Sequence, residues 1–295
     1  MAEITAAQVK ELRERTGVGM MECKKALVAT NGDMDLAIEE LRKSGRAKAD
    51  KKSGRVAAEG VVIMQTSNDG KLAVMVEINS ETDFVARDAN FLAFANAVAK
   101  TALAAKEQDV ATLMSLPIAG GDSTVEEARL MLVTKIGENI NVRRIVIATT
   151  QSGSIGTYLH GSRIGVLAEL DVNNQDLAKD IAMHIAASKP LVISQEDVSA
   201  DLVAKEKEIY MAQAATSGKP QEILEKMVGG KLKKFLDEVS LMGQPFVKDP
   251  EVMISTLLNK HRAKVLSFTR FEVGEGIEKE TEDFVEAVMA QVHGS

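Results

Sequence analysis

The spacing of hydrophobic and polar positions changes near residue 56. Before it, residues 1–45 contain three short stretches in which apolar residues recur every three or four positions, as on one face of an α-helix. Turn sequences at Thr16–Gly19 and Asn31–Asp33 separate these stretches. After it, apolar runs of strand length alternate with helical stretches. The pattern predicts a three-helix module followed by an α+β core.

The predicted core contains two similar halves. Leu72–Asn79 and Ile164–Asp171 are apolar or acidic in step at nearly every position, which indicates a duplicated α+β unit with antiparallel sheets. Each half begins with a β-hairpin, continues with a helix and closes with a strand. The predicted elements are Val61–Gln65, Leu72–Asn79, Phe91–Ala104, Thr124–Lys135 and Asn141–Thr149 in the first half, and Ile155–His160, Ile164–Asp171, Leu177–Ala187 and Val265–Val273 in the second.

A helical insertion postpones the last strand of the second half. Two helices, about 199–216 and 221–240, each carry one narrow apolar stripe and are joined by a Gly-Lys-Pro turn. The pattern favours a projecting coiled-coil hairpin, although both helices could instead lie flat on a sheet. A last amphipathic helix is predicted at about 281–292.

These patterns predict six regions. Residues 42–55 hold seven Lys or Arg and one acid, and they are interpreted as a solvated linker because no aromatic residue is interleaved for base stacking. A nucleic-acid patch is the alternative. The regions are a three-helix module at 1–45, a basic linker at 46–55, a first core subdomain at 56–150, a second at 151–196 with 241–275, a coiled-coil hairpin at 197–240 and a C-terminal helical module at 276–295.

Composition restricts the function classes. The 36 Lys and Arg against 43 Asp and Glu give a net charge of −7, which disfavours direct nucleic-acid binding. The single Cys23 excludes an internal disulfide and a multi-cysteine zinc site. No apolar run approaches the roughly 18 residues of a membrane span. We therefore expect a cytoplasmic protein with no membrane partner.

No common catalytic pattern is present. The four histidines lack metal-ligand spacing, and no glycine-rich segment completes a phosphate-binding or dinucleotide-binding loop. Glu77 and Glu169 occupy equivalent positions in the duplicated strands, which favours a structural role over a catalytic pair. We expect no catalysis by the chain's own groups and no cofactor.

The stretch 81–90, ETDFVARDAN, is the candidate site. It lies between a strand and a helix and is about six residues longer than its counterpart in the second half, so it is not a requirement of the duplicated fold. Thr82 is expected to cap a short helical turn, and Asp83 and Arg87 have ion-pair spacing. Phe84 would then lie exposed beside Asp83. In the alternative, Phe84 and Val85 fold back as a hydrophobic staple.

A second candidate contact lies in the N-terminal module. Its Gly17–Met20 turn resembles the docking loop of ubiquitin-associated-like domains, which present an apolar loop to a partner. The alternative is that Val18, Met20 and Met21 fill the core, since so small a module needs most of its apolar residues inside.

Four motifs together resemble the elongation factor Ts family. The resemblance covers the whole chain in order, including the helical hairpin. The motifs are Thr16–Met21, Thr82–Arg87, Lys135–Ile140 and Phe271–Gly276.

The resemblance implies a guanine-nucleotide exchange factor for the translational GTPase elongation factor Tu. In this family the Asp-Phe pair, here Asp83 and Phe84, intrudes beside the GTPase's nucleotide and disturbs its magnesium and phosphate contacts. The magnesium belongs to the GTPase. The N-terminal module docks on the nucleotide-binding domain, and His160 faces another domain. The expected partner-binding residues are Arg13, Val18, Met20, Met21, Thr82, Asp83, Phe84, Val85, Arg87, Ile136, Gly137 and His160.

Two other functions stay open at this point. The hairpin could make the chain a coiled-coil scaffold, or a homodimer, by pairing with itself or with another chain. The basic run at 42–55 could make it an RNA-associated translation protein.

Overall fold

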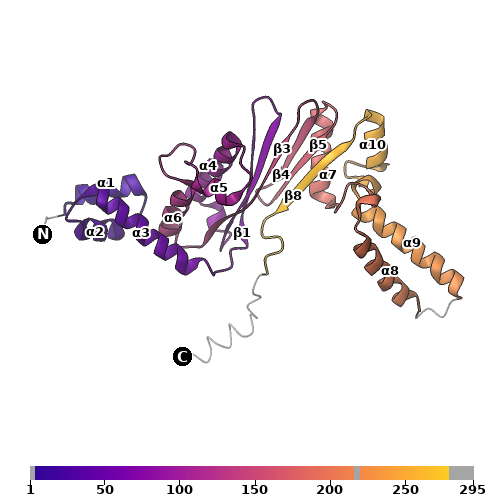
Figure 1. Cartoon of the computed structure of the whole chain (residues 1–295), viewed down its shortest axis with the longest axis horizontal. Coiled ribbons are helices and arrows are strands. Elements are labelled where there is room, and N and C mark those ends of the chain that lie inside the picture. The colour runs from indigo at the N-terminus through magenta and orange to yellow at the C-terminus, as the bar shows by residue number, and fades with distance from the viewer. Residues whose placement is uncertain (1–3, 216–219, 279–295) are drawn as a thin grey trace. The chain divides into compact units, whose positions relative to one another are not determined.

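The computed structural model describes residues 4–215 and 220–278 (Figure 1). They form two compact units. The first contains residues 4–65, 76–146 and 272–278, and the second contains residues 66–75 and 147–271. Helices and antiparallel strands occur in both halves of the chain, which confirms the α+β fold class.

Three helices form the N-terminal module, as predicted. Thr5 and Gln8 make a capping box at the start of the first helix, and Asp33 caps the third by accepting from two backbone N–H groups. The helices enclose a small core that includes Leu12, Cys23 and Leu27. They are α1 (Ala6–Thr16), α2 (Met20–Ala29) and α3 (Met34–Lys52).

The predicted linker at residues 46–55 is wrong over most of its length, because α3 continues to Lys52. Gly45 and Ala49 are buried, and α3 packs against α6 (Val125–Ile136). A Cβ at Gly45 would lie 2.9 Å from the hydroxyl of Thr134, so the two helices approach closely there. Residues four apart share a helix face, so Gly45 and Ala49 lie on the same side of α3. The many Lys and Arg residues of this stretch made that buried face hard to recognise from the sequence.

Two three-stranded sheets follow the same plan. A hairpin supplies the first two strands, and a third strand lies beside the second, in the orders β1-β2-β3 and β4-β5-β8. This order agrees with the duplication inferred from the sequence. The elements are β1 (Glu59–Thr66), β2 (Leu72–Ser80), α4 (Ala89–Ala105), α5 (Val110–Ser115) and β3 (Ile140–Thr149), then β4 (Ser154–His160), β5 (Ile164–Leu170), α7 (Gln175–Ser188) and β8 (Val265–Glu272).

In the second unit α7 packs against β4 and β5 (Figure 1). Within the sheet, β5 lies between β4 and β8. The β4–β5 pair is antiparallel, with Ser154 opposite Leu170 and His160 opposite Ile164. Short elements that lack a clear period were not predicted: α5 in the first half and, in the second, β6 (Pro245–Phe246), β7 (Asp249–Met253) and α10 (Ile254–His261).

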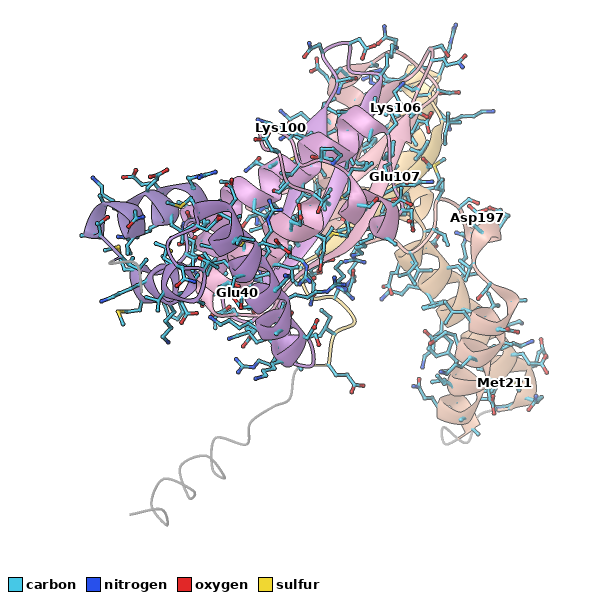
Figure 2. All side chains as sticks on the ribbon, turned by 60° about the vertical axis from the view of Figure 1, so that its left-hand side comes forward. Glu40, Lys100, Lys106, Glu107, Asp197 and Met211 are labelled. Carbon is cyan, nitrogen blue, oxygen red and sulfur yellow. The ribbon has the colours of Figure 1, made fainter. Side chains whose placement is uncertain are left out.

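The insertion contains the two predicted helices, α8 (Ala200–Ala215) and α9 (Gln221–Val239), which pack on each other. Ala214 and Val228 are buried, whereas Ile209, Met211 and Ile223 are exposed; Met211 is labelled in Figure 2. The helices therefore bury little beyond their mutual contact. The helix predicted at 281–292 lies outside the described residues.

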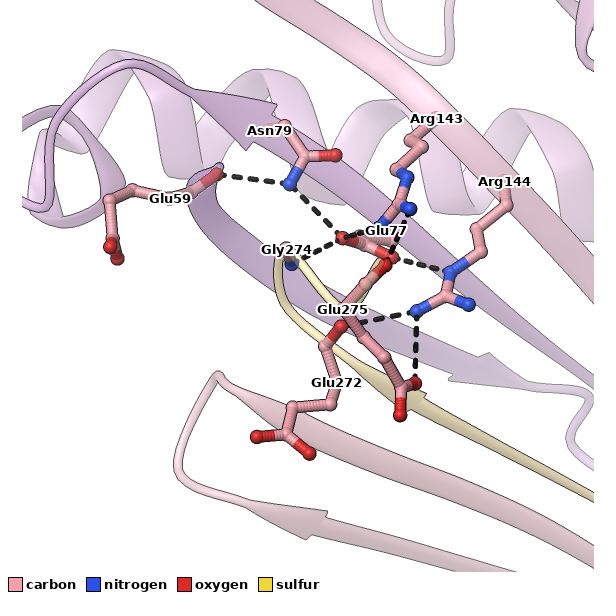
Figure 3. A network of polar contacts seen from close by, with 8 residues as sticks. All are labelled: Glu59, Glu77, Asn79, Arg143, Arg144, Glu272, Gly274 and Glu275. Atoms are coloured by element: carbon pink, nitrogen blue, oxygen red, sulfur yellow. Dashed lines mark hydrogen bonds and ion pairs between the residues drawn. The ribbon is translucent and has the colours of Figure 1, made fainter. Parts of the chain in front are cut away.

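A buried carboxylate connects three segments of the first unit (Figure 3). Glu77 on β2 is fully buried and pairs with Arg143, at 3.0 Å, and with Arg144, both on β3. It also accepts from the backbone N–H of Gly274 at 2.8 Å and from the amide of Asn79 at 3.0 Å. Glu77 thus ties the segment after β8 to the first sheet.

Two features of this network explain its residue types. Burial raises the pKa of Glu77, but hydrogen bonds from Gly274, Asn79 and Arg144 outweigh it, and the pKa lies below its ordinary value. Gly274 has a φ of 75°, and a Cβ there would lie 2.2 Å from the carbonyl oxygen of Ala58. Only glycine fits that approach.

A buried histidine makes the second unit sensitive to acid. His184 accepts from the backbone N–H of Val247 at 3.2 Å and lies 2.9 Å from the Gln244 side-chain oxygen, so its Nε2 carries the proton in the neutral ring. Burial lowers the pKa of His184, and the contact with Gln244 offsets this only in part. Protonation is therefore easier in the unfolded chain.

We expect the unfolding free energy to fall as pH drops through the unfolded-state pKa of about 6.5, by up to about 1.4 kcal/mol per pH unit. Chemical denaturation between about pH 7.5 and pH 5 measures this. The variant His184→Gln should give a flatter profile over that range. An equal slope in both proteins would contradict the assignment.

Candidate functional site

Residues 81–88 connect β2 to α4, whereas residues 171–174 make the corresponding connection in the second half. The added length is smaller than the six residues predicted, because β2 continues to Ser80 and β5 ends at Leu170, whereas both helices begin equally early, α4 at Ala89 and α7 at Gln175. A single helical turn, η1 (Val85–Arg87), occupies the longer connection. The longer connection in the first half is therefore confirmed, with a smaller difference.

Phe84 and Val85 lie on opposite sides of this turn. Phe84 is 81% exposed, the largest value among the exposed large hydrophobic side chains of the described residues, while Val85 is buried. The fold-back alternative thus holds for Val85 alone. Asp83 and Arg87 form the expected ion pair at 2.9 Å. The turn presents an aromatic ring to solvent beside a charged pair.

Carboxylates brace the start of the turn. The backbone N–H and the hydroxyl of Thr82 both donate to Glu138, at 3.0 and 2.7 Å. Glu81 in return accepts from the backbone N–H of Asn139 at 2.6 Å. The expected cap by Thr82 is present as a long contact: its hydroxyl oxygen accepts from the Val85 N–H at 3.4 Å, while its hydroxyl proton is donated to Glu138.

The end of the turn is held by the start of α4. Asp88 accepts from the backbone N–H groups of Asn90, at 2.8 Å, and Phe91, at 3.2 Å, and so caps the helix. Burial raises the pKa of Asp88, yet these hydrogen bonds and the charge of Lys135 leave it below its ordinary value. Lys135 also donates to the side-chain oxygen of Asn90 at 2.6 Å. Both ends of the turn are therefore fixed.

Two neighbouring grooves line this part of the first unit. The smaller, of about 360 Å³, lies beside Phe84 and includes Ile136. The larger, of about 600 Å³, includes Gly17 from the N-terminal turn. Asn90 and Lys135 line both. The structure thus brings the Gly17 turn, the end of α6 and the stretch 81–90 together.

The other predicted contact residues fall into different settings. Val18 is 1% exposed and belongs to the core of the three-helix module, so its prediction as a contact residue is wrong; a core this small needs that side chain. Met20 and Met21 are 45% and 66% exposed, and Arg13 is exposed. The alternative that both methionines fill the core is therefore wrong.

Gly137 and His160 have local roles that the sequence did not show. Gly137, with a φ of 89°, ends α6, and its carbonyl accepts from Lys52 at the end of α3. His160 is exposed at the end of β4 in the second unit, where its ring stacks with that of Tyr158 at 6.5 Å between centroids.

Sequence reasoning missed three residues that hold the turn in place. Glu81 accepts from Asn139, Glu138 accepts from Thr82, and Lys135 donates to Asn90. The only available signal was that Lys135 and Glu138 flank the Ile-Gly pair in one of the recognised motifs. Their long-range partners could not be inferred from spacing along the chain.

Neither a metal cluster nor a membrane span is found in the described part of the chain. Among residues 4–215 and 220–278, no three or more His, Cys, Asp or Glu side chains are grouped so that they could hold a metal ion. No helix within the same ranges is long and apolar enough to cross a membrane.

Comparison with known proteins identifies the class first, as a translation elongation factor. The family model described as elongation factor TS matches residues 81–275. The chain belongs to the elongation factor Ts family.

Curated relatives agree over the full length. The chain is 58% identical to elongation factor Ts of Legionella pneumophila over 292 residues, which cover 99% of each chain. It is 57% identical to that of Thioalkalivibrio sulfidiphilus over 293 residues, again 99% of each. It is 55% identical to that of Coxiella burnetii over 296 residues, covering both chains completely.

Proposed function

We propose that this chain binds elongation factor Tu carrying GDP and promotes GDP release, without chemistry of its own. The observation that carries the proposal is Phe84, an 81% exposed aromatic ring on a turn fixed at both ends. Exposing a large aromatic ring to water is unfavourable, and such rings are typical anchors of protein interfaces. Membership of the elongation factor Ts family supports the choice of partner.

The mechanism follows from linkage. A partner that binds the nucleotide-free GTPase more tightly than the GDP form must weaken GDP binding by the same factor. In our proposal Phe84 and Asp83 reach the magnesium and phosphate site of the GTPase. Because Asp83 is paired with Arg87, the turn would arrive with its charge already partly compensated. The GTPase supplies the magnesium, so this chain holds no cofactor.

Further contacts are proposed on two other surfaces. Arg13, Met20 and Met21 would dock on the nucleotide-binding domain of the GTPase, which the exposure of both methionines allows. Ile136 would add apolar surface beside Phe84, in the groove they share. His160 would contact another domain. We do not expect direct binding of nucleic acid.

Release of labelled GDP from purified elongation factor Tu tests the proposal. Adding this chain at catalytic concentration should raise the rate constant for release well above the intrinsic value. An equal concentration of an unrelated protein serves as the control. Unchanged release at saturating concentrations of this chain would overturn the proposal.

We also propose that the hairpin of α8 and α9 mediates pairing of two copies of the chain as a coiled coil. Ile209 and Met211 on α8 and Ile223 on α9 are exposed apolar side chains that a second copy could cover. Sedimentation should show a dimer that becomes a monomer in the variant Met211→Glu, whereas Lys226→Glu, at another exposed position of α9, should leave the dimer intact. A monomeric wild-type chain would contradict this idea.

A further inference from the structure

Two segments of the first unit hold each other through crossed carboxylate contacts. Residues 81–82 precede the turn that carries Phe84, and residues 138–139 follow the end of α6. Glu138 accepts from both donors of Thr82, at 3.0 and 2.7 Å, and Glu81 accepts from the N–H of Asn139 at 2.6 Å. We call these three contacts the 81–82/138–139 junction.

The junction is itself anchored to the surrounding unit. Asn139 is buried, and its side-chain amide donates to the carbonyl of Arg55 at 2.9 Å. Glu138 directly follows Gly137, whose carbonyl accepts a hydrogen bond from Lys52 of α3. The carboxylate that binds Thr82 therefore stands on a fixed support.

The contact between Glu138 and Thr82 restrains the residues that follow Thr82. Thr82 lies two residues before Phe84, and both its backbone N–H and its side chain are held by one carboxylate. Charge-assisted hydrogen bonds to two donors fix direction as well as distance. Beyond Phe84 the turn is held again by buried Val85 and by the cap at Asp88. Phe84 and Asp83 are the residues between these two supports.

We propose that Glu138 is a positioning residue that fixes Phe84 by holding Thr82, with Glu81 as its counterpart across the junction. The inference rests on the proposed function for its kinetic consequence: an aromatic ring that must enter another protein's nucleotide site works best when it is already oriented, so loosening it lowers the exchange rate. The orientation itself is a property of the isolated chain.

A fluorescent reporter tests the orientation without the GTPase. The sequence contains no Trp, so Phe84→Trp introduces a single indole at the exposed position. In this background the anisotropy decay of Trp at 84 should follow overall tumbling. Adding Glu138→Ala should introduce a fast nanosecond component, and Glu138→Gln, which keeps one acceptor, should give a smaller one.

The control is another carboxylate that holds a loop backbone. Glu107, labelled in Figure 2, accepts from the N–H of Asp109 at 2.7 Å, in the loop after α4. Glu107→Gln in the reporter background should leave the decay unchanged. Circular dichroism checks that each variant is folded. Thr82→Val, which removes the hydroxyl donor to Glu138 together with its long contact to the Val85 N–H, replaces any Glu138 variant that is not folded. A decay unaffected by Glu138→Gln and by Thr82→Val would overturn the proposal.

Exchange kinetics with Phe84 intact provide the second measurement. Glu138→Ala should lower the maximal rate of GDP release about tenfold, with a smaller change in the concentration for half-maximal effect. Thr82→Val should lower the rate less, and the double variant should be no slower than Glu138→Ala alone, because both act through one contact. Fully additive losses would refute a shared contact.

The two measurements separate the two proposals. If the wild-type chain does not accelerate GDP release, the proposed function fails, and the anisotropy decay still decides whether Glu138 orients residue 84. If the wild-type chain is active and the decay is unchanged in folded variants, the positioning role fails while the proposed function stands.

Discussion

Replacing Phe84 by alanine should slow GDP release from elongation factor Tu by about 30-fold or more, the effect of losing an interface anchor worth about 2 kcal/mol. The side chain is 81% exposed, so its removal should change the free energy of unfolding by no more than about 0.5 kcal/mol. The double variant with Asp83→Ala should be slower still. A large kinetic loss without loss of stability is typical of a contact residue.

Stopped-flow release of a fluorescent GDP analogue measures the rate, and thermal unfolding measures the stability. Leu191→Ala is a matched control, because Leu191 is also a large exposed apolar residue, at 58%, but lies before the hairpin in the second unit. GDP release from the GTPase should be as fast with Leu191→Ala as with the wild-type chain. Equal rates for Phe84→Ala and the wild type would contradict the role of Phe84 as an anchor, and an equal rate for the double variant with Asp83→Ala as well would remove residues 81–90 from the mechanism.

Replacing Glu77 by alanine should lower the free energy of unfolding of the first unit by about 3–5 kcal/mol, since it leaves Arg143 and Arg144 partly buried without their shared carboxylate. The Gly274 N–H would lose its acceptor as well. This is the largest stability effect that we expect from a single polar substitution in the described chain.

Glu169 provides the matched control for Glu77. It occupies the equivalent position in β5 but is half-buried, and its contact with the Ser267 hydroxyl is long, at 3.4 Å. Glu169→Ala should cost about 1 kcal/mol or less. Urea unfolding followed by circular dichroism, which needs no Trp, measures both variants. Similar losses for the two would show that the paired arginines add little.

The contribution of Glu77 to the free energy of unfolding should decrease in acid. The folded-state pKa of Glu77 is depressed, so its contribution to stability is fully present above its unfolded-state pKa of about 4.3 and is lost as pH falls through the folded value. The gap in stability between the wild type and Glu77→Gln should therefore narrow in acid. A constant gap down to about pH 3 would contradict the ionised pair.

Much of the fold could be predicted because its signals are local. Thr5 with Gln8 and the stripe on α9 lie within single elements, and the duplication follows from comparing two stretches of the same chain. The exposed position of Phe84 could be predicted for a related reason: the second half of the chain lacks a comparable stretch, so the longer connection stood out as an addition.

The rest depends on contacts between distant residues. Nothing in the local sequence indicates that Glu138 holds Thr82 or that Glu77 receives Gly274, since these pairs are far apart along the chain. The basic run of α3 was misinterpreted for the same reason: burial of Gly45 and Ala49 depends on α6, while charge alone indicates a solvated linker. Val18 was misassigned because core and contact residues share the same chemistry.

The continuous helix α3 changes how the N-terminal contacts should add to those of the turn. A flexible linker would let the module search a large volume, and each binding event would then cost conformational entropy. Helix α3 packs against α6, and Lys52 at its end donates to the carbonyl of Gly137. It therefore holds the module at a fixed effective concentration relative to the turn. On the proposed function, the module and the turn therefore engage the GTPase as a preorganised bivalent ligand, whose second contact costs little additional entropy.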